Sequence, residues 1–227
     1  MKNKRPVSEL EPKVRALKII ALLEKEYPKA KIALNYSNPV ELLVATILSA
    51  QVTDKKVNEV TEALFKKYRK AEDYARADLK KLEQEIRPTG FYHNKAKNIK
   101  AACQLLIKEY DSKVPKTMGE ILELPGVARK TANIVLANAY GVVEGIAVDT
   151  HVRRTSKRLG FTMNNDPNKI EQDLMKIIPR DKWMKITDLL IALGRDVCVA
   201  GLPKCEVCSL NQTCPSAFTF PDQRVKT

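Results

Sequence analysis

Four closely spaced cysteines near the C-terminal end are the residues with the clearest capacity for chemistry in this sequence. Cys198, Cys205, Cys208 and Cys214 follow the spacing C-x6-C-x2-C-x5-C. Disulfide pairing is disfavoured in a reducing cytosol, so ligation of a metal by thiolates is the stronger interpretation. Structural zinc usually takes its ligands as two close pairs, whereas here only one pair is close. The spacing therefore favours a cubane iron–sulfur cluster, whose corners each take one thiolate, over zinc.

Two adjacent cations at the start of a predicted helix form the second candidate site. The stretch "LPGVARKTAN", residues 124–133, is a Pro-Gly turn followed directly by a helical pattern, with Arg129 and Lys130 in its first turn. The N-terminal end of a helix carries partial positive charge, which disfavours cations there. Either both side chains point into solvent, or an anion binds at this position.

Helices dominate the elements that must position these residues. Apolar residues recur at helical spacing, and no segment has a convincing strand pattern. The periodicity and the turn residues predict helices over residues 11–27, 38–51, 53–68, 77–86, 94–110, 117–124, 128–140, 149–159, 167–178 and 182–196. The sequence thus predicts an all-α protein.

Several details of these helices can be predicted from residue type. Asn38 and Thr53 are suited to cap the second and third helices, because their short polar side chains accept hydrogen bonds from the first turn. In the first helix, Val14 and Leu17 begin an apolar pattern that continues through Ile20 and Leu23. Cys103 lies on the apolar side of its helix and is expected to be a small core residue.

The charge balance favours a nucleic-acid partner. The chain has 227 residues, with 40 Lys and Arg against 27 Asp and Glu, which gives a net charge of +13 and a pI near 9.5. A domain pI above about 9 is typical of nucleic-acid binding, and the excess is spread along the chain. No apolar run reaches the roughly 18 residues of a membrane span. The N-terminal segment has no apolar signal-peptide core, which predicts an intracellular protein.

These features together resemble one family. "LPGVARKTA", "AVDTH" and the cysteine spacing, with "LLVATILSAQVTD" and "GFYHNKAKNI", resemble the endonuclease III family of base-excision DNA glycosylases in order and in distance, over residues 14–215. The resemblance implies two helical domains with a DNA-binding cleft between them. Residues 33–143 would form a six-helix barrel with a helix-hairpin-helix, and residues 1–32 with 144–227 would form a domain holding a [4Fe-4S] cluster.

The resemblance also implies an activity and a partner. A member of this family removes oxidised pyrimidines from duplex DNA and nicks abasic sites by β-elimination. The match of motifs implies that Lys130 is the nucleophile that forms a Schiff base, and that Asp149 is the essential carboxylate. Asp149 is equally well suited to cap the following helix. We therefore expect a monomer in a prokaryotic cytoplasm, associated with the nucleoid and with DNA containing damaged bases or abasic sites.

The DNA contacts implied by the resemblance lie in three loops. Gln51 would fill the space left by a flipped base, Phe91 would wedge into the opposite strand, and Tyr92 with His93 would line the groove. Without the resemblance, Gln51 is an ordinary helix-end residue and Phe91 is better placed in the core. The hairpin would contact phosphate through Leu124, Gly126, Ala128, Arg129 and Thr131.

One residue of the hairpin departs from the family. The turn commonly reads Gly-Val-Gly, and here its third position is Ala128. Alanine costs about 1 kcal/mol if that position needs a positive φ. It is the better residue if the position opens the following helix, because glycine is worse there by about 1 kcal/mol. The continuous helical pattern from Ala128 onward favours the second case.

Two alternative functions remain at the level of sequence. A glycosylase with a different base specificity, such as the adenine-mismatch branch, shares the hairpin and the cluster but lacks the lysine. A non-catalytic iron–sulfur DNA-binding protein or an electron carrier would need neither Lys130 nor Asp149. His151, close to Asp149, is interpreted as a polar contact and not as a catalytic residue.

Overall fold

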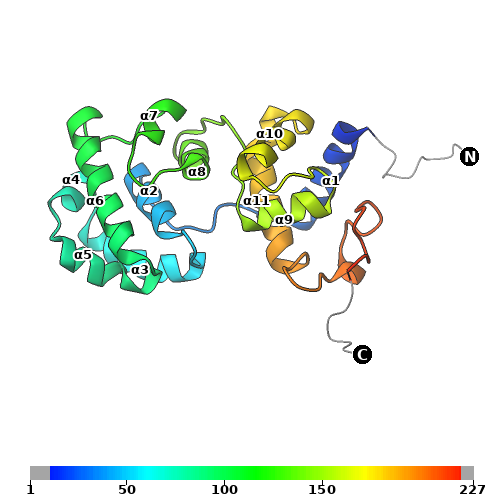
Figure 1. Ribbon diagram of the computed structural model, residues 1–227, viewed down its shortest axis with the longest axis horizontal. Coiled ribbons are helices and arrows are strands. Elements are labelled where there is room, and N and C mark those ends of the chain that lie inside the picture. Colours follow the sequence, from blue (N-terminus) through cyan, green and yellow to red (C-terminus); the bar gives the residue numbers. More distant parts are fainter. Residues whose placement is uncertain (1–10, 221–227) are drawn as a thin grey trace, which may run out of the picture. The chain divides into compact units, whose positions relative to one another are not determined.

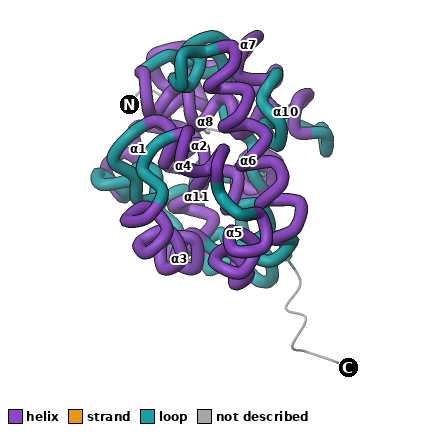
Figure 2. Tube along the Cα trace, turned by 90° about the vertical axis from the view of Figure 1, so that its left-hand side faces the viewer, coloured by secondary structure: helices purple, strands orange, loops and turns teal. Residues whose placement is uncertain are grey.

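The chain is helical throughout its described part. The structure, a computed structural model, describes residues 11–220; residues 1–10 and 221–227, part of the predicted cluster domain, lie outside that range. Figure 2 shows helices joined by loops, with no strand among the described residues. The all-α prediction is confirmed. Within residues 11–220, no helix is both long and apolar enough to cross a membrane.

The chain divides into two units, and each has its own hydrophobic core. One unit comprises residues 32–144, and the other joins residues 1–31 to residues 145–227. The elements of the first are coloured light blue to green in Figure 1, and those of the second dark blue and yellow to red. The N-terminal helix therefore folds with the C-terminal third of the chain.

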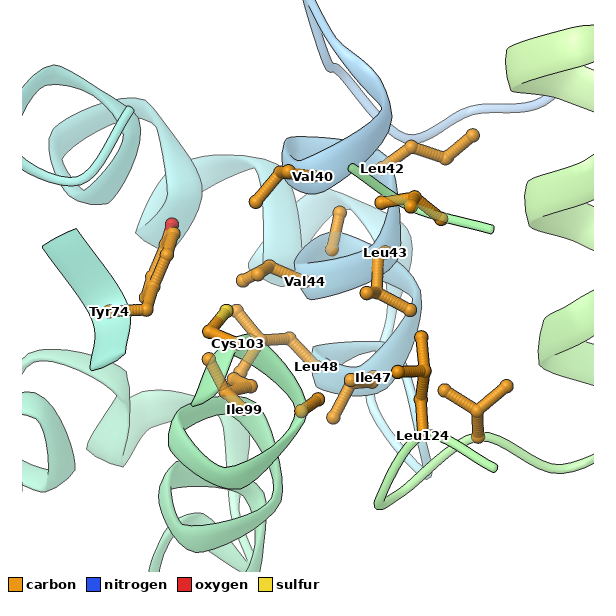
Figure 3. Close-up of a cluster of buried hydrophobic side chains, with 14 of the residues drawn as sticks. Val40, Leu42, Leu43, Val44, Ile47, Leu48, Tyr74, Ile99, Cys103 and Leu124 are labelled. Atoms are coloured by element: carbon orange, nitrogen blue, oxygen red, sulfur yellow. The ribbon is translucent and has the colours of Figure 1, made fainter. Parts of the chain in front are cut away.

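The unit of residues 32–144 is built around one buried helix. Its elements are α2 (Pro39–Leu48), α3 (Asp54–Lys67), α4 (Ala71–Arg76), α5 (Leu79–Ile86), the 3₁₀ turn η2 (Arg87–Thr89), α6 (Tyr92–Glu109), α7 (Met118–Leu122) and α8 (Arg129–Tyr140). From Val40 to Leu48 every residue of α2 is buried, including Glu41 and Thr46, and a helix that is apolar on most sides belongs inside a bundle. Figure 3 shows the α2 side chains against Ile99 and Cys103 of α6.

The second unit combines α1 with three later helices around one core. Its elements are α1 (Pro12–Glu26), α9 (Thr150–Arg158), α10 (Pro167–Ile177), the 3₁₀ turn η3 (Arg180–Lys182), α11 (Trp183–Asp196) and the 3₁₀ turn η4 (Cys205–Val207). Helix α11 packs against both α9 and α1, and α10 also contacts both. This arrangement places the first residue of α9 and the cysteines that follow α11 in the same unit.

The apolar pattern expected for α1 is partly wrong. Val14 and Leu17 are each 44% exposed, and the buried stripe runs through Ala16, Ile19, Ile20 and Leu23. Both sets of residues fit helical spacing, so periodicity alone does not choose between them. The contacts of α1 with α10 and α11 decide which side is buried.

The predicted caps are confirmed, and several helix assignments need correction: α2 ends at Leu48 and not at Gln51, and α6 begins at Tyr92 and not at Asn94. Asn38 Oδ1 accepts from the Glu41 N–H at 2.9 Å, and Thr53 Oγ1 accepts from the Lys56 N–H at 3.3 Å. Helix α4 was not expected, because its six residues are too few for a periodic pattern. Helix α8 begins at Arg129 and not at Ala128.

Candidate functional site

A tight turn connects α7 to α8 in the unit of residues 32–144. The Val127 N–H donates to the Leu124 carbonyl at 3.1 Å, which closes a four-residue turn. Pro125 occupies its second position and Gly126, with φ +80°, its third, as a type II turn requires. Leu124 and Val127 are buried and hold the turn on the core; Leu124 lies beside Ile47 in Figure 3. The backbone between them therefore has a fixed direction.

Glycine is needed at position 126 but not at position 128. A Cβ added to Gly126 would lie 2.8 Å from Asn98 Cβ, and the positive φ would strain any other residue. Ala128 has φ −96° and ψ 169°, an extended conformation open to every residue. The expectation that Ala128 avoids positive φ is right, but it is the N-cap of α8 and not its first helical residue.

The start of α8 has no side-chain cap. Ala128 makes no capping hydrogen bond, because its methyl group has no acceptor. The first N–H groups of a helix have no intrahelical partner, and an anion is a favourable acceptor for them. The first N–H groups of α8 therefore have no side-chain acceptor from their N-cap residue.

The hairpin geometry predicts a large loss of stability on substitution of Gly126 and a small change on substitution of Ala128. Gly126→Ala should lower the free energy of unfolding by at least about 1 kcal/mol, because alanine is strained at positive φ and meets Asn98. Ala128→Gly should change stability by less than about 1 kcal/mol, since better N-capping offsets the greater chain entropy of glycine when unfolded. Denaturant unfolding of both variants measures this difference. A large stabilisation by Ala128→Gly would mean that the alanine is strained.

The cations of α8 point away from the buried side of the helix. Lys130 is exposed, and Arg129 and Thr131 are half-buried. The opposite side carries Ala132 and Val135, which pack into the core where α8 meets α2. Lys130 is thus a solvent-accessible amine in the first turn of an uncapped helix.

Gln51 and Phe91 share an uncommon backbone conformation. Both have left-handed φ values, 58° for Gln51 and 49° for Phe91, and both side chains are exposed. Phe91 is 66% exposed, so its interpretation as a core residue is wrong. Such strained conformations persist where surrounding contacts enforce them, and they concentrate at functional sites. Sequence reasoning found both residues only through the family resemblance.

Tyr92 and His93 follow Phe91 in the first turn of α6. The Tyr92 and His93 ring centroids are 4.1 Å apart, and His93 Nδ1 lies 2.8 Å from Glu83 Oε2. Tyr92 is half-buried against the core, whereas the His93 side chain is 62% exposed. These contacts hold both rings beside Phe91.

Asp149 begins α9 in the second unit. Its Oδ1 accepts from the Val152 N–H at 2.7 Å, so the carboxylate is the N-cap that the sequence predicts. The residue is half-buried. The capping bond fixes the orientation of the carboxylate while leaving its other oxygen for further contacts.

His151 has a packing role in α9. Its Nδ1 lies 3.2 Å from the Arg154 guanidinium, and its ring meets the Cα face of Gly194 on α11. A Cβ at Gly194 would lie 3.0 Å from the His151 ring, so the glycine permits close packing of α9 on α11. This position agrees with the interpretation of His151 as a polar contact.

The four C-terminal cysteines line one pocket. Cys198 follows α11, Cys205 begins η4, and Cys208 and Cys214 lie on the loop beyond it. The apolar side chains around them are Leu159, Leu193, Val197 and Leu210. Spacing alone predicted that these cysteines would meet.

The donor set of this pocket is four thiols, the number that either a tetrahedral zinc ion or a cubane iron–sulfur cluster takes. Among residues 11–220, no group of three or more His, Cys, Asp or Glu side chains is placed to hold one metal ion. The side chains that line the pocket therefore fit a thiolate-bound metal group by their chemistry.

Arginines of α9 hold the cysteine loop in place. Arg154 Nε donates to the Cys198 carbonyl at 3.0 Å, and an Arg158 guanidinium nitrogen donates to the Val199 carbonyl at 2.7 Å. Arg158 also lies 3.4 Å from the Cys198 sulfur. Burial raises the pKa of the Cys208 and Cys214 thiols, so ligation requires a cationic centre that favours thiolate.

Comparison with known proteins identifies the class and then the family. The profile of the HhH-GPD superfamily of base excision DNA repair proteins matches residues 44–180. Endonuclease III of Synechocystis sp. is 53% identical over 205 residues, covering 90% of this chain and 94% of that protein. Endonuclease III of Bacillus subtilis is 46% identical, covering 83% of this chain and 86% of that protein. The chain belongs to the endonuclease III family.

A solved structure agrees with this assignment. A trapped endonuclease III–DNA covalent intermediate is 44% identical to this chain, with a TM-score of 0.87 over 92% of this chain and 98% of that one. The chain is therefore a base-excision repair enzyme of the DNA glycosylase and abasic-site lyase class. The non-catalytic alternative has no support among these matches.

Proposed function

We propose that this enzyme removes oxidised pyrimidines from duplex DNA and then cleaves the strand at the abasic site through a Schiff base on Lys130. The observation that carries the proposal is the exposed Lys130 amine in the first turn of α8, a helix that follows a tight turn and has no side-chain cap. The net charge of +13 supports the attraction of the chain to a polyanion.

DNA binding in this proposal uses the hairpin for position and two loops for base extrusion. The N–H groups at residues 128–131 hold a phosphate, and Arg129 adds positive charge beside it. Phe91 and Gln51, both exposed, enter the duplex and occupy the space left by the extruded nucleotide. Extrusion is necessary because the glycosidic carbon is inaccessible within the stacked duplex.

Lys130 and Asp149 share the chemistry in this proposal. The unprotonated Lys130 amine attacks C1′ and the bond from C1′ to the base breaks, so that the base leaves. The C1′–O4′ bond then breaks, which opens the sugar ring and gives the Schiff base. Loss of a C2′ proton expels the 3′ phosphate by β-elimination. Asp149 accepts a proton from the attacking amine and stabilises positive charge that develops on the sugar. Its capping bond to Val152 keeps the carboxylate oriented before the substrate arrives.

We further propose that the unit of residues 145–227 with the N-terminal segment holds a [4Fe-4S] cluster, and that the unit of residues 32–144 is the helix-hairpin-helix barrel. Cys198, Cys205, Cys208 and Cys214 would be the ligands, since they line one pocket with apolar walls. When bound, the cluster would cross-link the loop after α11. Arg154 and Arg158 hold the same loop to α9 through its carbonyls.

Metal analysis tests the cluster. The purified protein should contain iron and inorganic sulfide, and replacing Cys208 by Ser should lower both. Cys103→Ser is the matched control, because Cys103 is 1% exposed in the other unit and burial raises its thiol pKa to about 12. Iron content should be unchanged in that variant. Stoichiometric zinc without iron after anaerobic purification would contradict the proposal.

Trapping with borohydride tests the enzymatic proposal. Incubation with abasic duplex DNA and borohydride should produce a covalent protein–DNA adduct, since reduction fixes a Schiff base and leaves non-covalent complexes unlinked. An oligonucleotide with one oxidised pyrimidine should be cleaved at that base. Binding to abasic DNA without any adduct would contradict the lyase assignment.

The bacterial relatives and a genomic DNA substrate lead us to propose a nucleoid-associated protein of a prokaryotic cytoplasm, acting as a monomer.

A further inference from the structure

Lys95 is a buried lysine whose contacts are all to backbone. It lies on α6 and is 5% exposed. Its Nζ donates to the carbonyl of Leu48 at 2.8 Å, of Ala50 at 2.9 Å and of Thr89 at 2.8 Å. None of its contacts among the described residues is to a carboxylate.

The three carbonyls belong to the two loops that carry Gln51 and Phe91. Leu48 is the last residue of α2, and Ala50 directly precedes Gln51. Thr89 ends η2, two residues before Phe91. One ammonium group therefore joins the loop of Gln51 to the loop of Phe91. Gln51 and Phe91 both have left-handed φ values, so each loop contains a backbone conformation that its residue type does not favour.

The hydrogen-bond stoichiometry indicates a charged lysine. An ammonium has three N–H donors, and here three carbonyl oxygens accept them. Burial lowers the pKa of Lys95, and the carbonyl at the C-terminal end of α2 acts against that effect through the helix dipole. Burying a cation without a carboxylate is costly, and its hydrogen bonds to the three carbonyls offset that cost only while both loops keep their positions.

We propose that Lys95 is a positioning residue for base extrusion, which holds the loops of Gln51 and Phe91 in one fixed arrangement so that both side chains enter the duplex together. This inference rests on the proposed function of those two residues. Because α6 and the end of α2 belong to the rigid core, the lysine transmits their fixed positions to two exposed loops. Lys95 touches neither the substrate nor the reacting atoms.

The proposal predicts a loss confined to reactions that need extrusion. Lys95→Met should lower glycosylase activity on an oxidised pyrimidine in duplex DNA by about 10²-fold, the loss expected from misplacing groups by about 1 Å. Borohydride trapping on single-stranded abasic DNA should be unchanged, because the abasic nucleotide there does not have to be extruded from a duplex. The fluorescence of 2-aminopurine beside a non-cleavable abasic analogue in a duplex should rise with wild-type protein and not with the variant.

Lys100→Met is the matched control. Lys100 lies on the same helix, and its Nζ donates to one backbone carbonyl, that of Ala77, at 2.6 Å. That carbonyl is remote in sequence from both loops. The control should retain duplex activity and the fluorescence rise. Equal losses of duplex activity in the two variants, or an equal loss on single-stranded and duplex substrates with Lys95→Met, would overturn the proposal.

A combined variant separates this inference from the proposed function. Gln51→Ala with Phe91→Ala should itself lower duplex activity and the fluorescence rise, and adding Lys95→Met to that pair should have little further effect. If the pair has no effect, the proposed function of the loops fails. If the pair has an effect and Lys95→Met alone has none, only the inference about Lys95 fails.

A second variant covers the case in which Lys95→Met does not fold. Lys95→Arg keeps the cation and its donors but moves them outward, so it should fold and show an intermediate loss of duplex activity with normal single-strand trapping. Amide hydrogen exchange should then accelerate at residues 49–52 and 89–91 and not elsewhere in the unit. Full duplex activity of Lys95→Arg with accelerated exchange in both loops would show that their fixed arrangement is unnecessary.

Discussion

Lys130→Gln is expected to abolish covalent trapping on abasic DNA while leaving the fold and most DNA affinity intact. An amide nitrogen is not nucleophilic, so no Schiff base can form. Lys130 is exposed and makes no core contact, and glutamine is nearly as good a helix former as lysine. Stability should therefore change by less than about 0.5 kcal/mol. Gel analysis after borohydride reduction measures the adduct, and a binding titration with abasic duplex measures affinity.

Lys169→Gln is the matched control for this variant. Lys169 is also an exposed lysine in the first turn of a helix, but α10 is capped by Asp166, whose Oδ1 accepts from the Lys169 N–H at 3.0 Å. Its replacement removes the same charge from a helix start that has no open anion site. Trapping should equal that of the wild type. Adduct formation by Lys130→Gln at the wild-type yield would remove Lys130 from the mechanism.

Most of the helical fold could be predicted because its signals are local. The periodic apolar residues and the caps at Asn38 and Thr53 specify helix type and start without any tertiary contact. Helix α4 has only six residues, and its only buried side chains are Ala71 and Tyr74, so no periodic pattern identifies it. The buried side of α1 depends on the packing of α10 and α11 and could not be read from spacing.

The candidate site was predictable where residue type alone carries the chemistry. The cysteine spacing predicted one shared pocket, and the Pro-Gly turn predicted a bend before α8. The left-handed backbone of Gln51 and Phe91 could not be predicted, because neither residue type favours it and distant contacts enforce it. The assigned roles of these side chains stay predictions.

The burial of Lys95 could have been predicted from its position in the helical pattern of α6. It stands in the buried stripe of α6 with Ile99, Ala102 and Leu106, at spacings of three and four residues. A lysine within an apolar stripe must either be misplaced or have buried acceptors. Lys97 and Lys100 lie outside that stripe, so the pattern distinguishes Lys95 from its neighbours. What the sequence could not supply is the identity of the acceptors, which are backbone carbonyls of two other segments.

Asp149→Asn is expected to bind damaged DNA and to turn over about 10²–10⁴-fold more slowly, the usual contribution of carboxylate-assisted proton transfer. Asparagine caps a helix about as well as aspartate, so the hydrogen bond from the Val152 N–H should persist and α9 should keep its start. The substitution thus removes the charge and keeps the geometry. Loss of the interaction between the carboxylate and the helix dipole should cost about 0.3–1 kcal/mol of stability. Single-turnover kinetics on duplex DNA with one oxidised pyrimidine measure the rate.

Asp166→Asn separates the capping role of Asp149 from its chemical role. Asp166 is also an N-cap, at the start of α10 in the same unit, and accepts from the Lys169 N–H. Its replacement by asparagine should cost the same stability and leave turnover unchanged. A carboxylate that only capped α9 would make the two variants behave alike, with near-normal turnover in both. A rate loss in Asp149→Asn alone, at equal stability, would assign that loss to the negative charge of Asp149, because both variants keep the capping hydrogen bond.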